Sequence, residues 1–180
     1  MAQSSNRIIG SYDIICYSAD GNIKWSETCP NAVYDEGEQL ILDLALRGAS
    51  LSGWFMGLLK STLGASPPAE TTTLSGLTLA TNEPASGTEP GYSRQAISRD
   101  ATASGWPTLV LDSGDYRATS KVCSWNASGN WAGTIRFMFL TTEGTTGSSS
   151  GKLVSIAQLS TDRVLVSGDR LDITYSIKLA

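Results

Sequence analysis

The residues most capable of chemistry in this sequence are concentrated in one segment, EPGYSRQAISRD, at positions 89–100. It combines two arginines, a tyrosine, two serines and an aspartate, but the chain has no histidine. The lack of histidine excludes Ser-His-Asp and Cys-His catalysis and His-ligated zinc or iron. Without a nucleophile or base beside them, the arginines are expected to anchor a strand or a subunit contact. We therefore predict no catalytic residue, and Tyr92 and Arg94 become candidate interface residues.

Other residues that could do chemistry are dispersed along the chain. The 17 Asp and Glu residues could include the facing pair that a glycosidase needs, but most lie beside turn residues, where they cap turns. Three cysteines cannot form a thiolate zinc site without a fourth ligand. Gly151-Lys152 follows a Ser/Gly-rich loop but precedes another strand, so it is not expected to bind phosphate. We expect no metal and no cofactor. A small enzyme that uses a pair of carboxylates stays open as the third-ranked function, after the two functions given at the end of this subsection.

Five tryptophans suggest a sugar-binding hypothesis, because indole faces stack on pyranose rings. Trp25 and Trp54 fall in strands with a core pattern, which indicates burial. Trp106, Trp125 and Trp131 lie at turns and are the better candidates for exposed contacts. Those contacts could equally be with another protein, since interface cores are rich in Trp, Tyr and Arg.

Composition and charge restrict the class of partner. The chain has 180 residues, enough for one domain, with a net charge of −4 and 13 scattered basic residues. Nucleic acid and anionic membrane surfaces are therefore not expected as partners. The N-terminal sequence lacks a basic start and an apolar run, so we expect folding in a cytoplasm.

The first regular element expected is a β-hairpin at residues 8–28 around the turn Asp20-Gly21. Centring the turn there places Cys16 opposite Trp25 and Cys29 opposite Tyr12. The two cysteines would then be roughly 13 Å apart along the ladder, too far for a disulfide. Buried free thiols are expected instead.

One amphipathic helix is expected at residues 35–47. Acidic residues occupy its first turn, and Arg47 and Gly48 suit its C-terminus. Its apolar stripe predicts packing on the next run, GWFMGLL, which is apolar on both faces as in a strand covered on both sides. Residues 61–91 hold four of the six prolines and predict a long loop that covers a functional site or contacts a neighbour.

From residue 92 onward the pattern indicates successive strands. YRATSKVCSW and AGTIRFMFLTT flank NASGN as a second hairpin, and the final strand alternates cleanly from Leu171 to Leu179. Eight to ten strands with one helix predict an all-β fold, an antiparallel β-sandwich that is jelly-roll-like.

Several local motifs occur in a characteristic order: NAVYDEG at residues 31–37, GWFMGLL at 53–59, GYSRQ at 91–95 and SGDRLDITYSIKL at 167–179. This order resembles small virion structural proteins of tailed bacteriophages, of the head-decoration, collar or tail-associated type. The resemblance covers about residues 31–180, the expected sandwich domain, and leaves residues 1–30 as an N-terminal hairpin or docking element.

The resemblance implies a non-enzymatic protein that folds in the host cytoplasm and assembles on a virion as a homotrimer. Its expected partners are further copies of itself and the major capsid protein or other virion proteins. A capsid decoration (cement) protein would stabilise the shell by binding across neighbouring capsomers. The second alternative is a collar or tail-fibre-associated β-sandwich that binds carbohydrate.

Overall fold

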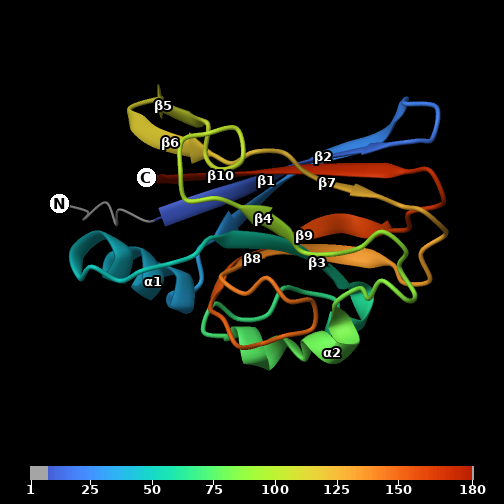
Figure 1. The fold of residues 1–180 in the computed structure, drawn as a ribbon, viewed down its shortest axis with the longest axis horizontal. Helices are drawn as coiled ribbons and strands as arrows, with labels where there is room; N and C mark the ends of the chain where they lie inside the picture. The colour runs from blue at the N-terminus through green and yellow to red at the C-terminus, as the bar shows by residue number, and fades with distance from the viewer. Residues whose placement is uncertain (1–7, 180) are drawn as a thin grey trace.

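The computed structural model describes residues 8–179, which form a sandwich of two antiparallel sheets (Figure 1). The first sheet has the order β2-β1-β10-β6-β5, and β7 also pairs with β10. Its strands are β1 (Ile8–Tyr17), β2 (Ile23–Ala32), β5 (Thr108–Asp112), β6 (Asp115–Thr119), β7 (Cys123–Asn126) and β10 (Arg170–Leu179). The second sheet is β4-β3-β8-β9, built from β3 (Trp54–Lys60), β4 (Gln95–Ile97), β8 (Ile135–Thr141) and β9 (Leu153–Arg163). The expected all-β sandwich is confirmed.

The hairpin β1–β2 has the register that its turn sequence predicts. Tyr12 lies opposite Cys29 and Cys16 opposite Trp25, and all three cysteines are free and buried. β1 also pairs with β10 over its whole length, so the hairpin is part of the sandwich. Within the expected N-terminal element, residues 1–7 lie outside the described residues.

The main core lies between the two sheets. Alternate residues of β1 and β10 point into it, including Tyr12, Ile14, Ile173 and Tyr175, all at most 1% exposed. Period-two alternation places every second side chain on one face, which is why these strands bury one face and leave the other in contact with solvent.

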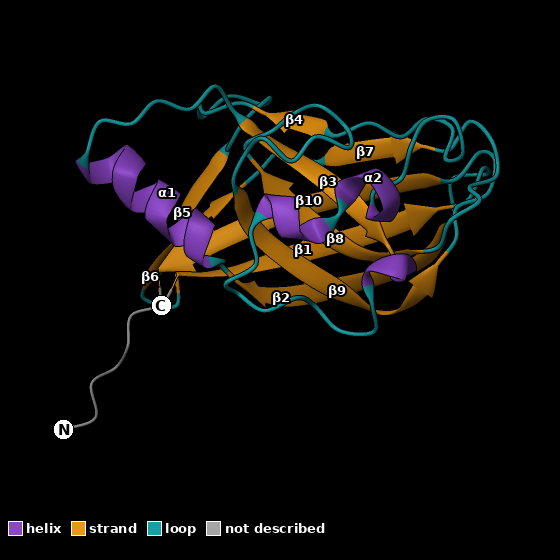
Figure 2. Cartoon of the chain, turned by 90° about the horizontal axis from the view of Figure 1, so that it is seen from below, coloured by secondary structure: helices purple, strands orange, loops and turns teal. Residues whose placement is uncertain are grey.

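A second apolar cluster covers the outer face of the β3-β8-β9 sheet. Residues 61–91 form it with three short helices, η1 (Ser61–Leu63), η2 (Leu74–Leu77) and α2 (Leu79–Asn82). Leu74 and Leu77 from this segment pack with Phe137 and Phe139 of β8. The expected burial of β3 on both faces is therefore confirmed, and the long segment covers the chain's own sheet (Figure 2).

Helix α1 (Asp35–Leu46) forms where the sequence predicts it, with Arg47 paired to Asp43 and Gly48 at positive φ. The predicted partner strand was wrong, because α1 packs on β9 and the β3 face is already covered by residues 61–91. Gly37 allows the close approach, since a Cβ there would lie 2.6 Å from the carbonyl oxygen of Val154. Among residues 8–179, no helix has the length and apolar character needed to cross a membrane.

The second predicted hairpin was also wrong. β7 pairs with β10 and β8 pairs with β3 and β9, so the turn sequence NASGN connects the two sheets. The segment before it is not one strand but two, because Ser120 interrupts the ladder. Its backbone N–H donates to the carbonyl of Tyr175, whose own N–H donates to the Ser120 hydroxyl.

Candidate functional site

Within the segment 89–100, Tyr92 and Arg94 belong to a buried polar cluster and not to a surface site. The guanidinium of Arg94 makes two hydrogen bonds of 2.8 Å to the Glu83 carboxylate, and both side chains are at most 1% exposed. The Tyr92 hydroxyl donates to Glu83 (2.6 Å) and accepts from the N–H of Leu58 (3.1 Å). Burial, reinforced by the charge of Glu83, raises the pKa of Tyr92 well above its ordinary value.

This cluster connects three parts of the chain that are distant in sequence. Arg94 also donates to the carbonyls of Glu143 and Ser148, and Glu83 accepts the N–H of Gly147. The segment 61–91 and the loop 142–152 are thereby attached to the same point on the sheet. Every donor and acceptor that the structure shows here has a partner within the chain. Arg94 therefore anchors segments of its own chain, which is the first of the two roles expected for it, and the burial of Tyr92 and Arg94 (4% and 6% exposed) contradicts their assignment as candidate interface residues.

Trp125 and Trp131 are likewise buried, at 0% and 3% exposure, so the expectation of exposed contacts is corrected for both. Tyr92 stacks parallel to Trp125 and packs edge-on against Trp131. Each indole N–H donates to a backbone carbonyl, of Ser93 and Pro90 respectively. Their position beside the NASGN turn suggested exposure, but both side chains belong to the main apolar core, with Trp125 at a buried position of β7.

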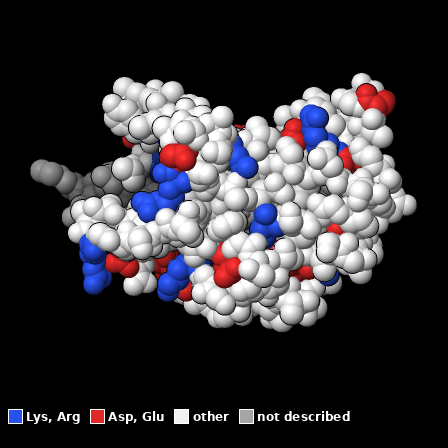
Figure 3. Space-filling model, viewed as in Figure 1, with Lys and Arg blue, Asp and Glu red and all other residues white. Residues whose placement is uncertain are grey.

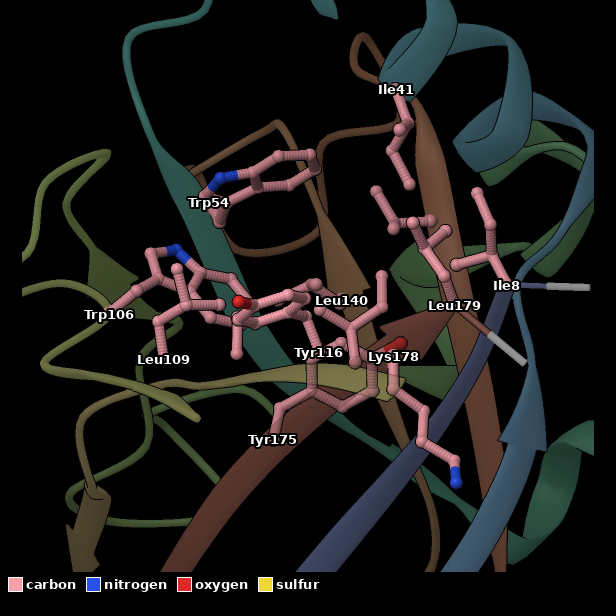
Figure 4. A pocket seen from close by; sticks show the side chains of 13 residues that line it. Ile8, Ile41, Trp54, Trp106, Leu109, Tyr116, Leu140, Tyr175, Lys178 and Leu179 are labelled. Carbon is pink, nitrogen blue, oxygen red and sulfur yellow. The ribbon is translucent and has the colours of Figure 1, made fainter. Parts of the chain in front are cut away.

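Trp106 is the one predicted site residue that lines an open hollow. An apolar groove of about 380 Å³ lies at one end of the sandwich, and Trp106 and Trp54 form one wall with ring centroids 6.5 Å apart (Figure 4). Ile8, Ile41 and Leu179 lie on the other side, and Tyr175 of the core lines the groove between them.

The groove exists because apolar strand faces continue beyond the core. The inward face of β10 proceeds from buried Tyr175 to half-buried Ile177 and then to Leu179, which is 63% exposed. Helix α1 lies on one side of the opening and the β5–β6 hairpin projects from the body on the other (Figure 1). No further layer of the described chain closes the gap between them.

Large apolar side chains are also exposed on the elements that border this groove. Among residues 8–179, seven such side chains lie on α1, on the β5–β6 hairpin or at the end of β10. We use the name apolar end for these seven side chains together with the groove. They are Leu42, Leu46, Leu109, Val110, Leu111, Tyr116 and Leu179, with exposed fractions between 39% and 78%. This surface was not predicted from the sequence, although the all-apolar run LVL at 109–111 and the two leucines outside the helix stripe were signals for it.

The chemistry of the groove is limited by its lining. Among its lining residues the polar side-chain groups are two tyrosine hydroxyls, of which that of Tyr175 is fully buried, two indole N–H groups and Lys178, whose ammonium lies 3.6 Å from Asp115. It contains no carboxylate, and three further hollows on the described chain contain Asp112, Asp100 and Glu70 respectively, one carboxylate each. On the face seen in Figure 3, acidic and basic residues are scattered. The groove is suited to receive apolar side chains.

Comparison of the chain with models of protein families, with curated proteins and with solved structures found no match.

Proposed function

We propose that this protein is a non-enzymatic structural protein that assembles through its apolar end. The observation that carries the proposal is the set of exposed leucines on the elements that border an open apolar groove, while Tyr92 and Arg94 of the GYSRQ motif are buried and internally paired. Contiguous exposed apolar patches on a soluble fold mark interaction sites. Each exposed leucine contributes little to folding, and its burial free energy becomes available when a partner covers it.

The proposed setting is the virion of a tailed bacteriophage, where the chain would serve as a capsid decoration protein. The order of motifs from NAVYDEG to SGDRLDITYSIKL supports this setting. In that role the apolar end binds across neighbouring capsomers, and the shell must lose these contacts before it opens. A sandwich stabilised by two apolar clusters and a buried ion pair suits a protein that acts by binding alone.

Carbohydrate binding is the second candidate, and one observation favours it. Trp54 and Trp106 present indole rings to an open groove, as sugar stacking requires. A sugar hydroxyl, however, needs hydrogen-bond partners, and an unpaired polar group in an apolar pocket costs roughly 1–3 kcal/mol. The lining described above offers few such partners, so it favours apolar protein side chains.

The proposal is tested by sedimenting the purified chain with particles of the encoding phage that lack it. We expect saturable binding to the heads. Leu179→Lys and Leu46→Lys should weaken this binding at least tenfold, because each places a charge in the buried contact. Ile23→Lys is the matched control, since Ile23 is 62% exposed but lies at the tip of the β1–β2 hairpin, outside the apolar end.

Two results would contradict the proposal. Wild-type chain that stays in the supernatant at every concentration would exclude a decoration role. Saturable binding on a glycan array that is lost in Trp106→Ala would show that the groove binds carbohydrate.

A further inference from the structure

Strand β5 is a free edge of the first sheet. Its only strand partner among residues 8–179 is β6, and the β5–β6 hairpin projects away from the body (Figure 1). The hairpin turns through Ser113 and Gly114, both at positive φ (56° and 98°), as in the two-residue type I′ turn. Asp112 and Asp115 face each other across this turn, and the residues that flank a two-residue hairpin turn form a hydrogen-bonded pair.

The hairpin register determines which backbone groups of β5 point outward. Hydrogen-bonded pairs alternate with non-bonded pairs in an antiparallel ladder. With Asp112 and Asp115 bonded, Val110 and Arg117 are bonded as well, and Leu109 and Leu111 direct their N–H and C=O groups away from β6. The outer edge of β5 therefore presents two donors and two acceptors, carried by its two most exposed leucines.

Natural edge strands usually prevent pairing with charges, proline or a bulge. β5 contains no proline and no bulge, its one charged residue is Asp112 at the turn, and its ladder with β6 is regular. Leu109 and Leu111 are 67% and 63% exposed, so the edge is apolar as well as unpaired. These are the properties of a strand that accepts another strand.

We propose that β5 pairs in antiparallel fashion with β5 of a second copy, about a twofold axis at Val110. In this register Leu109 lies opposite Leu111 of the second copy and vice versa, so the outward groups form four backbone hydrogen bonds. Val110 lies opposite Val110. Asp112 lies opposite Thr108, which places a hydroxyl against a carboxylate and keeps like charges from facing each other. The five-residue edge is thus complementary to itself.

The size of the contact indicates its strength. At about 25 cal/mol per Å² of buried apolar surface, the burial free energy of a leucine side chain corresponds to roughly 100 Å². A tyrosine presents about 200 Å². With their exposed fractions, Leu109, Val110, Leu111 and Tyr116 contribute about 300 Å² per copy, or about 600 Å² in the pair. Stable interfaces bury about 1,200 Å² or more. The pair is therefore reversible on dilution and is reinforced where a shell holds two copies side by side.

The inference names a second copy as one partner of the apolar end and so rests on the proposed function. It is tested in solution by replacing Val110 with cysteine, because the three native cysteines are buried. A non-bonded antiparallel pair has Cα atoms about 4.5 Å apart, within the range of a disulfide. Under mild oxidation, Val110→Cys should form a covalent dimer at least about tenfold faster than Ile23→Cys, because pairing raises the local thiol concentration.

Two further variants test the register. Thr108→Cys and Asp112→Cys should each cross-link no faster than Ile23→Cys, because equal positions lie about 13 Å apart across the axis. A mixture of the two should cross-link rapidly, since position 108 faces position 112 of the second copy.

The inference is overturned if Val110→Cys dimerises no faster than Ile23→Cys, or if the mixture behaves like its separate components. Equal cross-linking at all three positions would also overturn it, because that pattern indicates random collisions. Cross-linking with this register in a chain that does not sediment with heads would retain the strand pairing and reject the virion role.

Discussion

Removing the Arg94 guanidinium should destabilise the fold more than any surface substitution of the same size. Arg94→Met preserves most of the side-chain volume but deletes four hydrogen bonds, two to Glu83 and one each to the carbonyls of Glu143 and Ser148. It also removes the guanidinium that lies 5.2 Å from the Phe139 ring centroid. The Glu83 carboxylate would remain buried, with the Tyr92 hydroxyl and the Gly147 N–H as its remaining donors.

The expected loss of unfolding free energy is about 3–5 kcal/mol, the usual cost of leaving one member of a buried ion pair uncompensated. Arg94→Lys retains the charge but cannot form the two parallel bonds, so about 1.5–3 kcal/mol is expected. Arg99→Met is the control in the same segment. Arg99 is exposed and makes one bond of 3.2 Å to the Leu51 carbonyl, so its replacement should cost about 0.5 kcal/mol or less.

The assay is urea unfolding followed by tryptophan fluorescence, with Glu83→Gln and the double variant completing a mutant cycle. Because Glu83→Gln removes the stranded charge, the double variant should lose clearly less than the sum of the single losses. Amide exchange provides a local readout, since Gly147 should exchange faster in Arg94→Met. A cost below about 1 kcal/mol for Arg94→Met, or additive losses in the cycle, would refute a stabilising role for the cluster.

Three other perturbations follow from the geometry. Gly91 has φ +92°, and a methyl group there would overlap the carbonyl oxygen of Asn126, so Gly91→Ala should cost about 3 kcal/mol or more in urea unfolding. Gly21→Ala, at φ +83° in open space, should cost only about 1 kcal/mol, and equal costs would contradict the steric argument. Burial raises the pKa of Cys16 to about 11 and those of Cys29 and Cys123 to about 12. A thiol reagent at pH 8 should therefore label no cysteine of the folded chain until urea is added. Rapid labelling of the folded chain would contradict this. Burial also raises the pKa of Tyr12, Tyr92 and Tyr175, so the unfolded chain releases these protons at lower pH than the folded chain. The free energy of unfolding should therefore fall above about pH 10, by about 1.4 kcal/mol per pH unit for each tyrosine. A free energy of unfolding that stays constant from pH 9 to 11.5 would contradict this.

The local sequence patterns predicted which helices and strands form better than they predicted which elements pack against each other. The Asp20-Gly21 signal predicted the register of the β1–β2 hairpin as far as Cys16 and Trp25, but the connection itself is longer than two residues, because the register shifts after Cys16 and the Ser18 N–H donates to the Asn22 carbonyl. Helix α1 followed from its charges and stripe, which are local signals. Its partner strand did not, because a stripe shows that a helix packs on something apolar without showing on what.

The candidate site residues show the same contrast between local signals and long-range packing. Tyr92, Arg94, Trp125 and Trp131 are residue types enriched at interfaces, but a buried polar cluster uses the same types for the same reasons. Only long-range packing decides between the two, and here Glu83, eleven positions before Arg94, supplies the partner. Trp106 lines an open groove because the β5–β6 hairpin beside it projects from the body, and its contact with a partner stays a prediction.

The position of the apolar end follows from how the two sheets are stabilised. Both apolar clusters are complete without the leucines of β5, since the inner faces of β1 and β10 and the outer face of the β3-β8-β9 sheet are already covered by other parts of the chain. Leu109 and Leu111 therefore add little to the stability of the isolated fold, while they leave an unpaired apolar edge exposed to aggregation. A charge at either position would remove that liability at little cost to folding. The exposed edge is accordingly best explained by a partner strand, and the Val110→Cys cross-link distinguishes a second copy from any other partner.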